Sequence, residues 1–497
     1  MSPERSFSKT ARIILILIGT MLLFRAPNDP DFGWHYKYGE WMTQHLAFPK
    51  DNVFSFTMLD YKWADSYWLS EVLMFITAKS LGFIGLSLVF GLLFSILTLA
   101  LVQKIECTKA VKAFIIITFW ALAGLYSTSV RPFYFSSILV LLLSYILLFK
   151  EKYIKFLPIL FLVWANMHAD FVTGLFIFGV HTLFTTAPNL TKNFNLKVLF
   201  RNTFPLFLSF GTTLINPYGI SLWLTMLKEM LNHSQFDWIT EWMPLHSIIS
   251  EKGAGLSVFV SLIFLLLIFA IPLVLNRKKI KPWYLISNLF FFLLLLRMRY
   301  FVRIFVVFSL FATFSYWNVT FTKLWQKITR NLDKKYLTVL VTSIFVLFLV
   351  VISLFFIRNL YLAGSIERWS KHYNYPYKAV VYLKTHPVEG NILNHFNWGG
   401  YLIWQLPEYK PFIDGRMTSW VDKDGYLLKL YDQISEHSES NAALLESYIK
   451  NYNIKLILIP KDSHLAVYLK NVKNKTWEVV YEDELAVVLG MKVQSTK

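Results

Sequence analysis

The sequence predicts a polytopic, all-α membrane protein with about eleven transmembrane helices, followed by a small α/β domain outside the cytoplasm. Hydrophobic residues make up 55% of the 497 residues and charged residues only 16%. Apolar windows recur up to residue 357, and none of comparable length follows. Soluble proteins carry about 25% charged residues, and a membrane-spanning helix needs about 20 mostly apolar ones. The composition therefore excludes a soluble multidomain protein.

The predicted spans follow the apolar windows in chain order. The first and fifth windows are short, and the first is interpreted as a retained helix because no small-residue cleavage site follows it. The windows are 11–26, 83–103, 113–130, 132–149, 156–168, 171–187, 203–217, 254–276, 283–299, 301–319 and 337–357.

The distribution of Lys and Arg predicts the topology. Basic residues gather on alternate connections, for example at 104–112, 150–155 and 277–281. The positive-inside rule places these connections and the N-terminus in the cytoplasm, so residues 358–497 lie outside. The net charge of +18 then reflects membrane topology and implies no nucleic-acid partner. The single cysteine, Cys107, excludes a disulfide within the chain and a multi-cysteine metal site.

The first outer loop, 27–82, combines acidic and aromatic residues. It contains Asp29, Asp31 and His35 among several Trp and Tyr residues, a composition typical of an interfacial segment. A helix is expected over 67–80, lying on the membrane and ending near Gly82.

Further polar residues fall on the predicted outer side, where ionisable groups at membrane depth are costly and usually functional. For Arg131, the alternative to a functional role is that its side chain only extends its charge to the membrane interface. For NPYG at 216–219, the alternative is that it only ends a helix in a turn. Arg297, Arg299 and Arg303 lie on this outer side although the positive-inside rule disfavours basic residues there. Because guanidinium groups bind phosphate by paired hydrogen bonds, these three arginines predict an anion-binding site. The outer-side residues are Arg131, Asn166, His168, Asp170, Glu241, Arg297, Arg299 and Arg303.

Residues 358–497 alternate between helix and strand patterns, which predicts a small α/β domain. Strands are expected at 390–396, 411–414 and 454–460, and a terminal hairpin within 476–490. Helices are expected at 379–386, 443–453 and 463–472. Asp414 and Arg416 either pair with each other or reach the membrane site. The domain is expected to cap the active face or hold the acceptor.

Several sequence blocks together resemble bacterial members of the GT-C superfamily of polytopic glycosyltransferases. These enzymes are similar to protein mannosyltransferases, lipid A aminoarabinose transferases and the oligosaccharyltransferase catalytic subunit. The blocks are DPDFGWHYKYGEWM at 29–42, FSFT at 54–57, WLSEV at 68–72, WANMHADFVTGL at 164–175, NPYG at 216–219, EWMP at 241–244, FNWGGYLIWQLP at 396–407 and FIDGR at 412–416.

The resemblance implies a GT-C-like fold, a polyprenyl-phosphate-linked sugar donor and a catalytic acid in the first outer loop. That acid corresponds to Asp31 or Asp29, and Asp31 is favoured because it stands beside the WHY cluster. A helix N-cap is the alternative role for either residue. The candidate substrate-binding residues are His35, Arg131, Asn166, His168, Asp170, Glu241, Arg297, Arg299, Arg303, Trp398, Asp414 and Arg416.

The expected function is a hexosyl- or pentosyltransferase of the bacterial cytoplasmic membrane. Residues 1–357 would form the membrane domain with its catalytic loop 27–82, and 358–497 the outer domain. The carboxylate would take a proton from an acceptor hydroxyl on a glycan, lipid or protein, with inversion at the sugar. Arg297 and Arg299 would stabilise the leaving lipid phosphate.

These residues identify no cofactor, and the acidic loop offers oxygen ligands for a divalent cation. The alternative function is a non-catalytic lipid-linked glycan transporter or an envelope scaffold. A transporter typically has inverted repeats and ionisable residues at the membrane midplane. The sequence shows no such repeat, which favours the enzyme.

Overall fold

The computed structural model describes residues 6–27, 29–126, 130–192, 195–231, 239–250, 255–331, 333–422, 425–471 and 476–492. The chain divides into two compact units. Unit 1 comprises Met1–Ala26, Leu81–Asn216 and Phe236–Tyr361. Unit 2 comprises Pro27–Ser80, Pro217–Gln235 and Leu362–Lys497.

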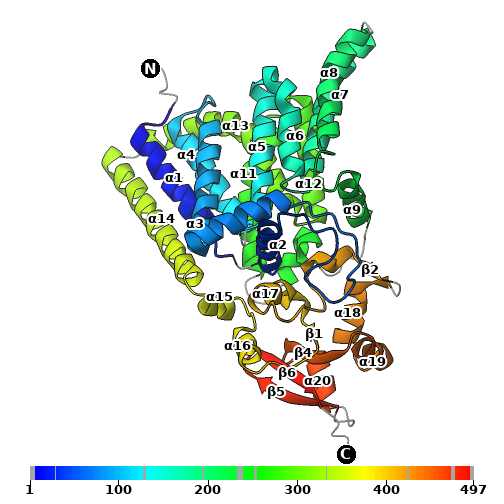
Figure 1. Cartoon of the computed structure of the whole chain (residues 1–497). Coiled ribbons are helices and arrows are strands. Elements are labelled where there is room, and N and C mark those ends of the chain that lie inside the picture. Colours follow the sequence, from blue (N-terminus) through cyan, green and yellow to red (C-terminus); the bar gives the residue numbers. More distant parts are fainter. Residues whose placement is uncertain are drawn as a thin grey trace, which may run out of the picture. The chain divides into compact units, whose positions relative to one another are not determined.

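Unit 1 is a bundle of apolar helices (Figure 1). Helix α3 continues into it from unit 2, and a break in helical geometry at Gly82 separates the two parts. The α-helices are α1 (Lys9–Leu23), α3 (Trp68–Val102), α4 (Lys109–Tyr126), α5 (Phe133–Phe149), α6 (Leu157–Ala165), α7 (Phe171–Lys192), α8 (Leu196–Thr212), α11 (Gly255–Leu275), α12 (Pro282–Arg297), α13 (Phe301–Asn331) and α14 (Lys334–Ala363). The 3₁₀ turns are η1 (Glu151–Phe156), η2 (Thr240–Trp242), η3 (Leu245–Ser250) and η4 (Arg277–Lys279).

Every predicted span overlaps a helix of unit 1, although the window 203–217 extends past the end of α8 and residues 127–129 of the window 113–130 lie outside the described residues. Within the described residues, four helices are long and apolar enough to cross a membrane by themselves, or five if the bent helix α13 counts as one span. Helix α6 has only 9 residues, a length of about 13 Å, which falls short of a bilayer core. The structure thus supports a multi-pass membrane protein, and the expected number of eleven spans remains a prediction.

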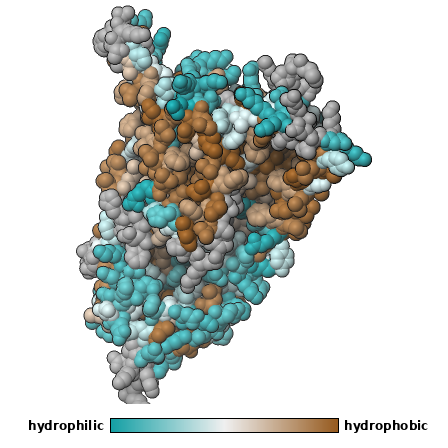
Figure 2. Space-filling model, turned by 180° about the vertical axis from the view of Figure 1, so that it is seen from behind, coloured by the Kyte–Doolittle hydropathy of each residue, from teal (hydrophilic) through white to brown (hydrophobic). Residues whose placement is uncertain are grey.

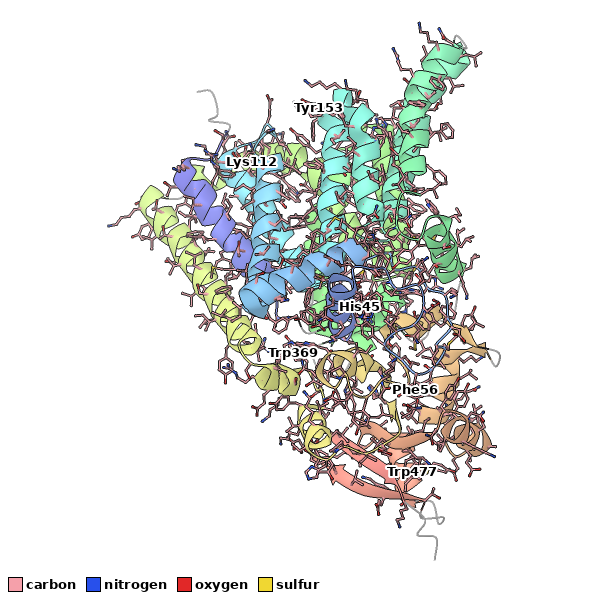
Figure 3. All side chains as sticks on the ribbon, viewed as in Figure 1. His45, Phe56, Lys112, Tyr153, Trp369 and Trp477 are labelled. Atoms are coloured by element: carbon pink, nitrogen blue, oxygen red, sulfur yellow. The ribbon has the colours of Figure 1, made fainter. Side chains whose placement is uncertain are left out.

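The basic connections of unit 1 gather at one end of its helices. Figure 3 shows Lys112, near the start of α4, and Tyr153, in η1, at the same end. The end of α7 and the start of α8 also lie there (Figure 1). This arrangement is the one that the alternation of basic and non-basic connections predicts.

Much of the surface is apolar. Figure 2 shows a broad hydrophobic area on one face of the molecule. Helix α14 is an extreme case, because only 6% of its apolar window is buried. Exposure of so large an apolar area to water is unfavourable, and such a surface is typical of helices that face lipid.

Unit 2 is built on a four-stranded sheet of order β1-β4-β6-β5. Strand β1 pairs parallel with β4, while β6 pairs antiparallel with both β4 and β5. The central strands β4 and β6 are buried almost throughout, which explains their continuous apolar sequences. The strands are β1 (Asn391–Asn394), β4 (Ile454–Pro460), β5 (Trp477–Glu482) and β6 (Ala486–Met491).

The remaining elements of unit 2 are short. The expected terminal hairpin is confirmed as β5 and β6. The strand predicted at 411–414 is wrong: only Pro411 bridges to Ile392, and the next residues turn into η6. The elements are α2 (Phe32–His45), α9 (Ile220–Leu231), α15 (Ile366–His372), α16 (Tyr377–Thr385), η5 (Phe396–Trp398), α17 (Gly399–Gln405), η6 (Gly415–Ser419), β2 (Val421–Asp422), β3 (Gly425–Tyr426), α18 (Leu427–Glu436), α19 (Ala442–Asn451) and α20 (His464–Asn471).

Residues 27–80 are folded into unit 2 by close packing of α2 on α17. A Cβ added to Gly33 would lie 1.9 Å from the carbonyl oxygen of Gly400, and one added to Gly400 would lie 2.1 Å from that of Pro30. Only glycine permits this approach of two backbones. Ser55 and Thr57 extend the contact by donating to the carbonyls of Pro411 and Phe412. These contacts explain why the two sequence blocks carry glycine.

Candidate functional site

Unit 1 brings five of the predicted polar residues together with Tyr300. Asp170, between α6 and α7, accepts a hydrogen bond from Arg303 Nη2 at 2.9 Å and another from the hydroxyl of Tyr300. Both the Asp170 and the Arg303 side chains are at least 90% buried. Arg303 also donates to the carbonyl of Phe133. We call the connected group the Arg303 cluster: Arg131, His168, Asp170, Glu241, Tyr300 and Arg303.

The second ion pair of this cluster joins Arg131 Nη1 to Glu241 Oε1 at 2.6 Å. The segment that carries Glu241 is pinned to the turn between α12 and α13. The backbone N–H of Tyr300 donates to the Glu241 carbonyl at 2.8 Å, and Trp242 stacks on Tyr300. Arg131 is thus an ion-pair partner of Glu241 in the structure.

Charge in the cluster is largely matched. Burial raises the pKa of Asp170, but the combined attraction of Arg303, His168 and Tyr300 outweighs it, and the net shift of this pKa is downward. The Nδ1 atom of His168 accepts the backbone N–H of Asp170 at 3.1 Å, so this ring nitrogen carries no proton. Both observations indicate a neutral His168 ring beside an ionised Asp170.

The other predicted residues of unit 1 lie around the cluster. Arg299 donates to the hydroxyl of Ser247 at 2.5 Å, and its backbone N–H donates to Met243. Arg297 is the last residue of α12 and is exposed. Asn166 donates to the carbonyls of Leu162 and Ile215, so its amide ties the end of α6 to the connection that follows α8.

In unit 2, Asp29 and Asp31 form the turn that leads into α2. Asp29 Oδ1 accepts the backbone N–H of Asp31 at 2.9 Å. Asp31 occupies the N-cap position of α2 without a side-chain capping bond, and its Oδ1 instead accepts the indole N–H of Trp34 at 3.0 Å. A Cβ on Gly415 would lie only 1.9 Å from the same oxygen. The carboxylate of Asp31 is therefore fixed between an indole donor and the FIDGR turn.

His35 points into the interior of unit 2. Its Nδ1 lies 2.8 Å from Glu71 Oε1, and both side chains are buried. Burial raises the pKa of Asp65 to about 6, and burial together with the neighbouring Asp65 raises the pKa of Glu71. Both shifts favour a protonated carboxyl group beside His35 in the interior of unit 2.

Asp414 and Arg416 pair with each other, which is the first of the two alternatives for FIDGR. The bond from Arg416 Nη2 to Asp414 Oδ2 is 2.6 Å, and both side chains are fully buried. Arg416 also donates to the hydroxyl of Tyr38 in α2. Trp398 is buried, and its indole donates to the carbonyl of Asn374 at 3.0 Å. These residues hold unit 2 together.

Sequence reasoning missed two participants. Tyr300 contacts Asp170 and Trp242, and Glu71 contacts His35. Tyr300 lies between Arg299 and Arg303 in the sequence, and Glu71 lies in the WLSEV block. The neighbouring residues could therefore have drawn attention to both positions. Within the described ranges, no group of three or more His, Cys, Asp or Glu residues is arranged to hold a metal ion.

Comparisons with known proteins bear on the fold. No protein-family model and no curated protein matches the chain. A structure of oligosaccharyltransferase AglB from Archaeoglobus fulgidus, in complex with an inhibitory peptide and a dolichol-phosphate, is similar with a TM-score of 0.55. The sequences are 12% identical, and the match covers 91% of this chain and 69% of that one. The chain has the fold of AglB.

A second structure agrees. The apo form of the same Archaeoglobus fulgidus oligosaccharyltransferase has a TM-score of 0.51, at 12% identity and with the same coverage of both chains. The likeness to an oligosaccharyltransferase that the sequence blocks imply is thereby confirmed at the level of the fold. The likeness to AglB covers nearly all of the chain.

Proposed function

We propose that the protein is a membrane glycosyltransferase that moves a sugar from a polyprenyl-phosphate-linked donor to an acceptor outside the cytoplasm, with inversion. The observation that carries the proposal is the AglB fold over 91% of the chain. AglB was solved with a dolichol-phosphate, a lipid phosphate of the proposed donor class. The acceptor is a glycan, a lipid or a protein.

Asp31 is the proposed general base. Its carboxylate takes the proton of an acceptor hydroxyl, and that oxygen forms a bond to the anomeric carbon. The bond from this carbon to the phosphate oxygen breaks on the opposite face, and the electron pair leaves with the lipid phosphate. The hydrogen bond from Trp34 and the contact with Gly415 support this role, because they fix the orientation of the carboxylate.

Arg297 and Arg299 are the proposed phosphate-binding residues. Guanidinium groups bind phosphate through charge-assisted hydrogen bonds and stabilise the charge that develops on the leaving group. Arg131 and Arg303 already pair with the carboxylates of Glu241 and Asp170. We therefore propose that Arg131 and Arg303 stabilise the structure of unit 1 and do not bind the phosphate.

We also propose the setting of the reaction. The chain lies in a bacterial cytoplasmic membrane with a cytoplasmic N-terminus, and residues 358–497 lie outside. The membrane domain is 1–357, with the catalytic loop 27–82. The excess of basic residues on alternate connections supports this topology.

A strain that lacks the gene tests the function. Lipid extracts, analysed by mass spectrometry, are expected to accumulate a polyprenyl-phosphate-linked sugar, and the wild-type gene should remove it. Asp31→Asn should not remove it, although the protein reaches the membrane in normal amount. Asp60→Asn is the matched control, since Asp60 is an exposed acid of the same loop. Full rescue by both Asp31→Asn and Asp29→Asn would instead favour a transporter or scaffold.

A further inference from the structure

Helix α9 carries an exposed apolar stripe. Ile220, Leu224, Leu227 and Leu231 follow the spacing i, i+4, i+7 and i+11, which puts all four on one face of the helix. Their side chains are 59%, 60%, 49% and 73% exposed. A helix that faces water normally carries polar residues at such positions.

The opposite face of α9 is covered by unit 2. Leu222 and Met226 are buried there, four residues apart. Lys228 Nζ donates to the hydroxyl of Tyr61 at 2.7 Å, and Glu229 hydrogen-bonds with Trp63. The orientation of the helix is therefore set by contacts with the loop 27–80, and the apolar stripe is left facing outward.

The flanks of the stripe differ from each other. Ser221, Thr225 and Lys228 lie on one side of it, and Trp223 and Met230 on the other. A polar flank, an aromatic residue and a wide apolar face are typical of helices that lie in the plane of a membrane interface.

Two further observations indicate that the lipid bilayer covers the apolar stripe of α9. Only residues 213–219 separate α9 from α8, whose outward side carries the exposed Phe200, Phe204 and Phe207. The first part of α3, also in unit 2, exposes Leu73 and Ile76 and continues directly into a candidate span. Figure 1 shows this part of α3 and α9 at the end of unit 2 that lies away from its sheet.

We propose that α9 is an in-plane membrane anchor, with Ile220, Leu224, Leu227 and Leu231 inserted among the upper acyl chains of the bilayer. Such helices bury their apolar face about 5–10 Å into the boundary between headgroups and acyl chains. The polar flank stays in contact with water. The anchor holds the loop that carries Asp31 against the membrane surface through the contacts of Lys228 and Glu229.

The test uses single cysteines in the full-length protein. In a Cys107→Ser background, Leu224→Cys and Leu227→Cys report on the stripe, and Ser221→Cys reports on the polar flank of the same helix. Leu347→Cys, on the exposed face of α14, reports on a membrane span. Each variant is labelled with the environment-sensitive fluorophore NBD and placed in phosphatidylcholine–phosphatidylglycerol vesicles that contain brominated lipids.

Both stripe labels are expected to emit at shorter wavelength than the Ser221 label. They should be quenched more strongly by bromines near the headgroup end of the acyl chain than by deep bromines, whereas the Leu347 label should show the reverse order. Stripe labels that match the Ser221 label in emission and quenching would overturn the proposal. So would energy transfer between stripe labels without quenching by bromolipid, because the stripe would then contact a second copy of the chain.

Discussion

Arg303 and Asp170 form an ion pair of 2.9 Å in which both side chains are almost completely buried. The pair joins α13 to the connection between α6 and α7, and Tyr300 donates to the same carboxylate. When one partner of a buried ion pair is removed, the other charge stays buried without compensation, and the fold is destabilised.

Removal of one partner should therefore be costly. Asp170→Asn leaves the Arg303 guanidinium buried beside a neutral amide, and we expect a loss of about 3 kcal/mol in the free energy of unfolding. Thermal unfolding in detergent measures the effect. The exposed pair of Lys281 and Glu151 is the control, because Glu151→Gln should change stability by less than about 1 kcal/mol. Equal effects at both pairs would contradict the prediction.

Gly415→Ala should impair turnover through Asp31. The new Cβ would lie 1.9 Å from Asp31 Oδ1, so the carboxylate must move. A displacement of about 1 Å from the reactive geometry can cost about 100-fold in rate, and we expect a fall of this order in kcat. Donor consumption by reconstituted protein measures it. Gly211→Ala is the control, since nothing lies within 4 Å of its added Cβ.

Arg299→Gln should weaken binding of the lipid-linked donor, because the side chain loses the charge that holds phosphate. A rise in KM of about tenfold, equivalent to about 1.4 kcal/mol, is expected. Initial rates against donor concentration in vesicles provide the measurement. Arg201→Gln, an exposed arginine of α8, serves for comparison. An unchanged KM in Arg299→Gln would remove this residue from the donor site.

The buried carboxyl group of Asp65 predicts a dependence of stability on pH. Burial raises its pKa from 3.8 to about 6, so the folded protein retains a proton that the unfolded chain loses between these values. The stability that protonated Asp65 contributes is complete below about pH 4 and is lost as the pH rises through about 6. Glu71, Arg416 and the backbone N–H of Tyr67 surround this carboxyl group.

Asp65→Asn tests this dependence. The neutral amide has no charge to bury, so the stability of the variant relative to wild type should improve as the pH rises from 4 to 7. Chemical denaturation in detergent at several pH values measures the difference. A difference that stays constant over this range would show that Asp65 does not titrate there. The same substitution at Asp60, an exposed acid of the loop, is the control.

Apolar windows and strand patterns predicted most elements of the fold, since both depend on local sequence. The strand at 411–414 was predicted because PFID is apolar and short, but Asp414 instead caps η6 and binds Arg416. Tertiary contacts of one carboxylate thus overrode the local pattern. The positions of the polar residues at helix ends predicted that they share one side of the bundle, because alternate connections of antiparallel helices meet at one end. The ion pair of Arg303 with Asp170 was not predicted.

Pairings within the candidate sites were harder to predict. Asp414 and Arg416 are two residues apart, so their pairing was one of two open alternatives. The contacts of His35 with Glu71 and of Arg131 with Glu241 join residues 36 and 110 positions apart. Such partners are chosen by the packing of elements, and no spacing in the sequence encodes them.

The packing of α2 on α17 has a consequence for biosynthesis. Residues 27–80 leave the ribosome before most of the bundle, whereas the glycines that receive them, Gly400 and Gly415, are translated after the bundle. The sheet beneath them closes only with β6, at the end of the chain. The segment that bears Asp31 therefore lacks its packing partners until the residues of α17 and β6 have been synthesised, so a nascent chain truncated before them carries the acid without the structure that orients it.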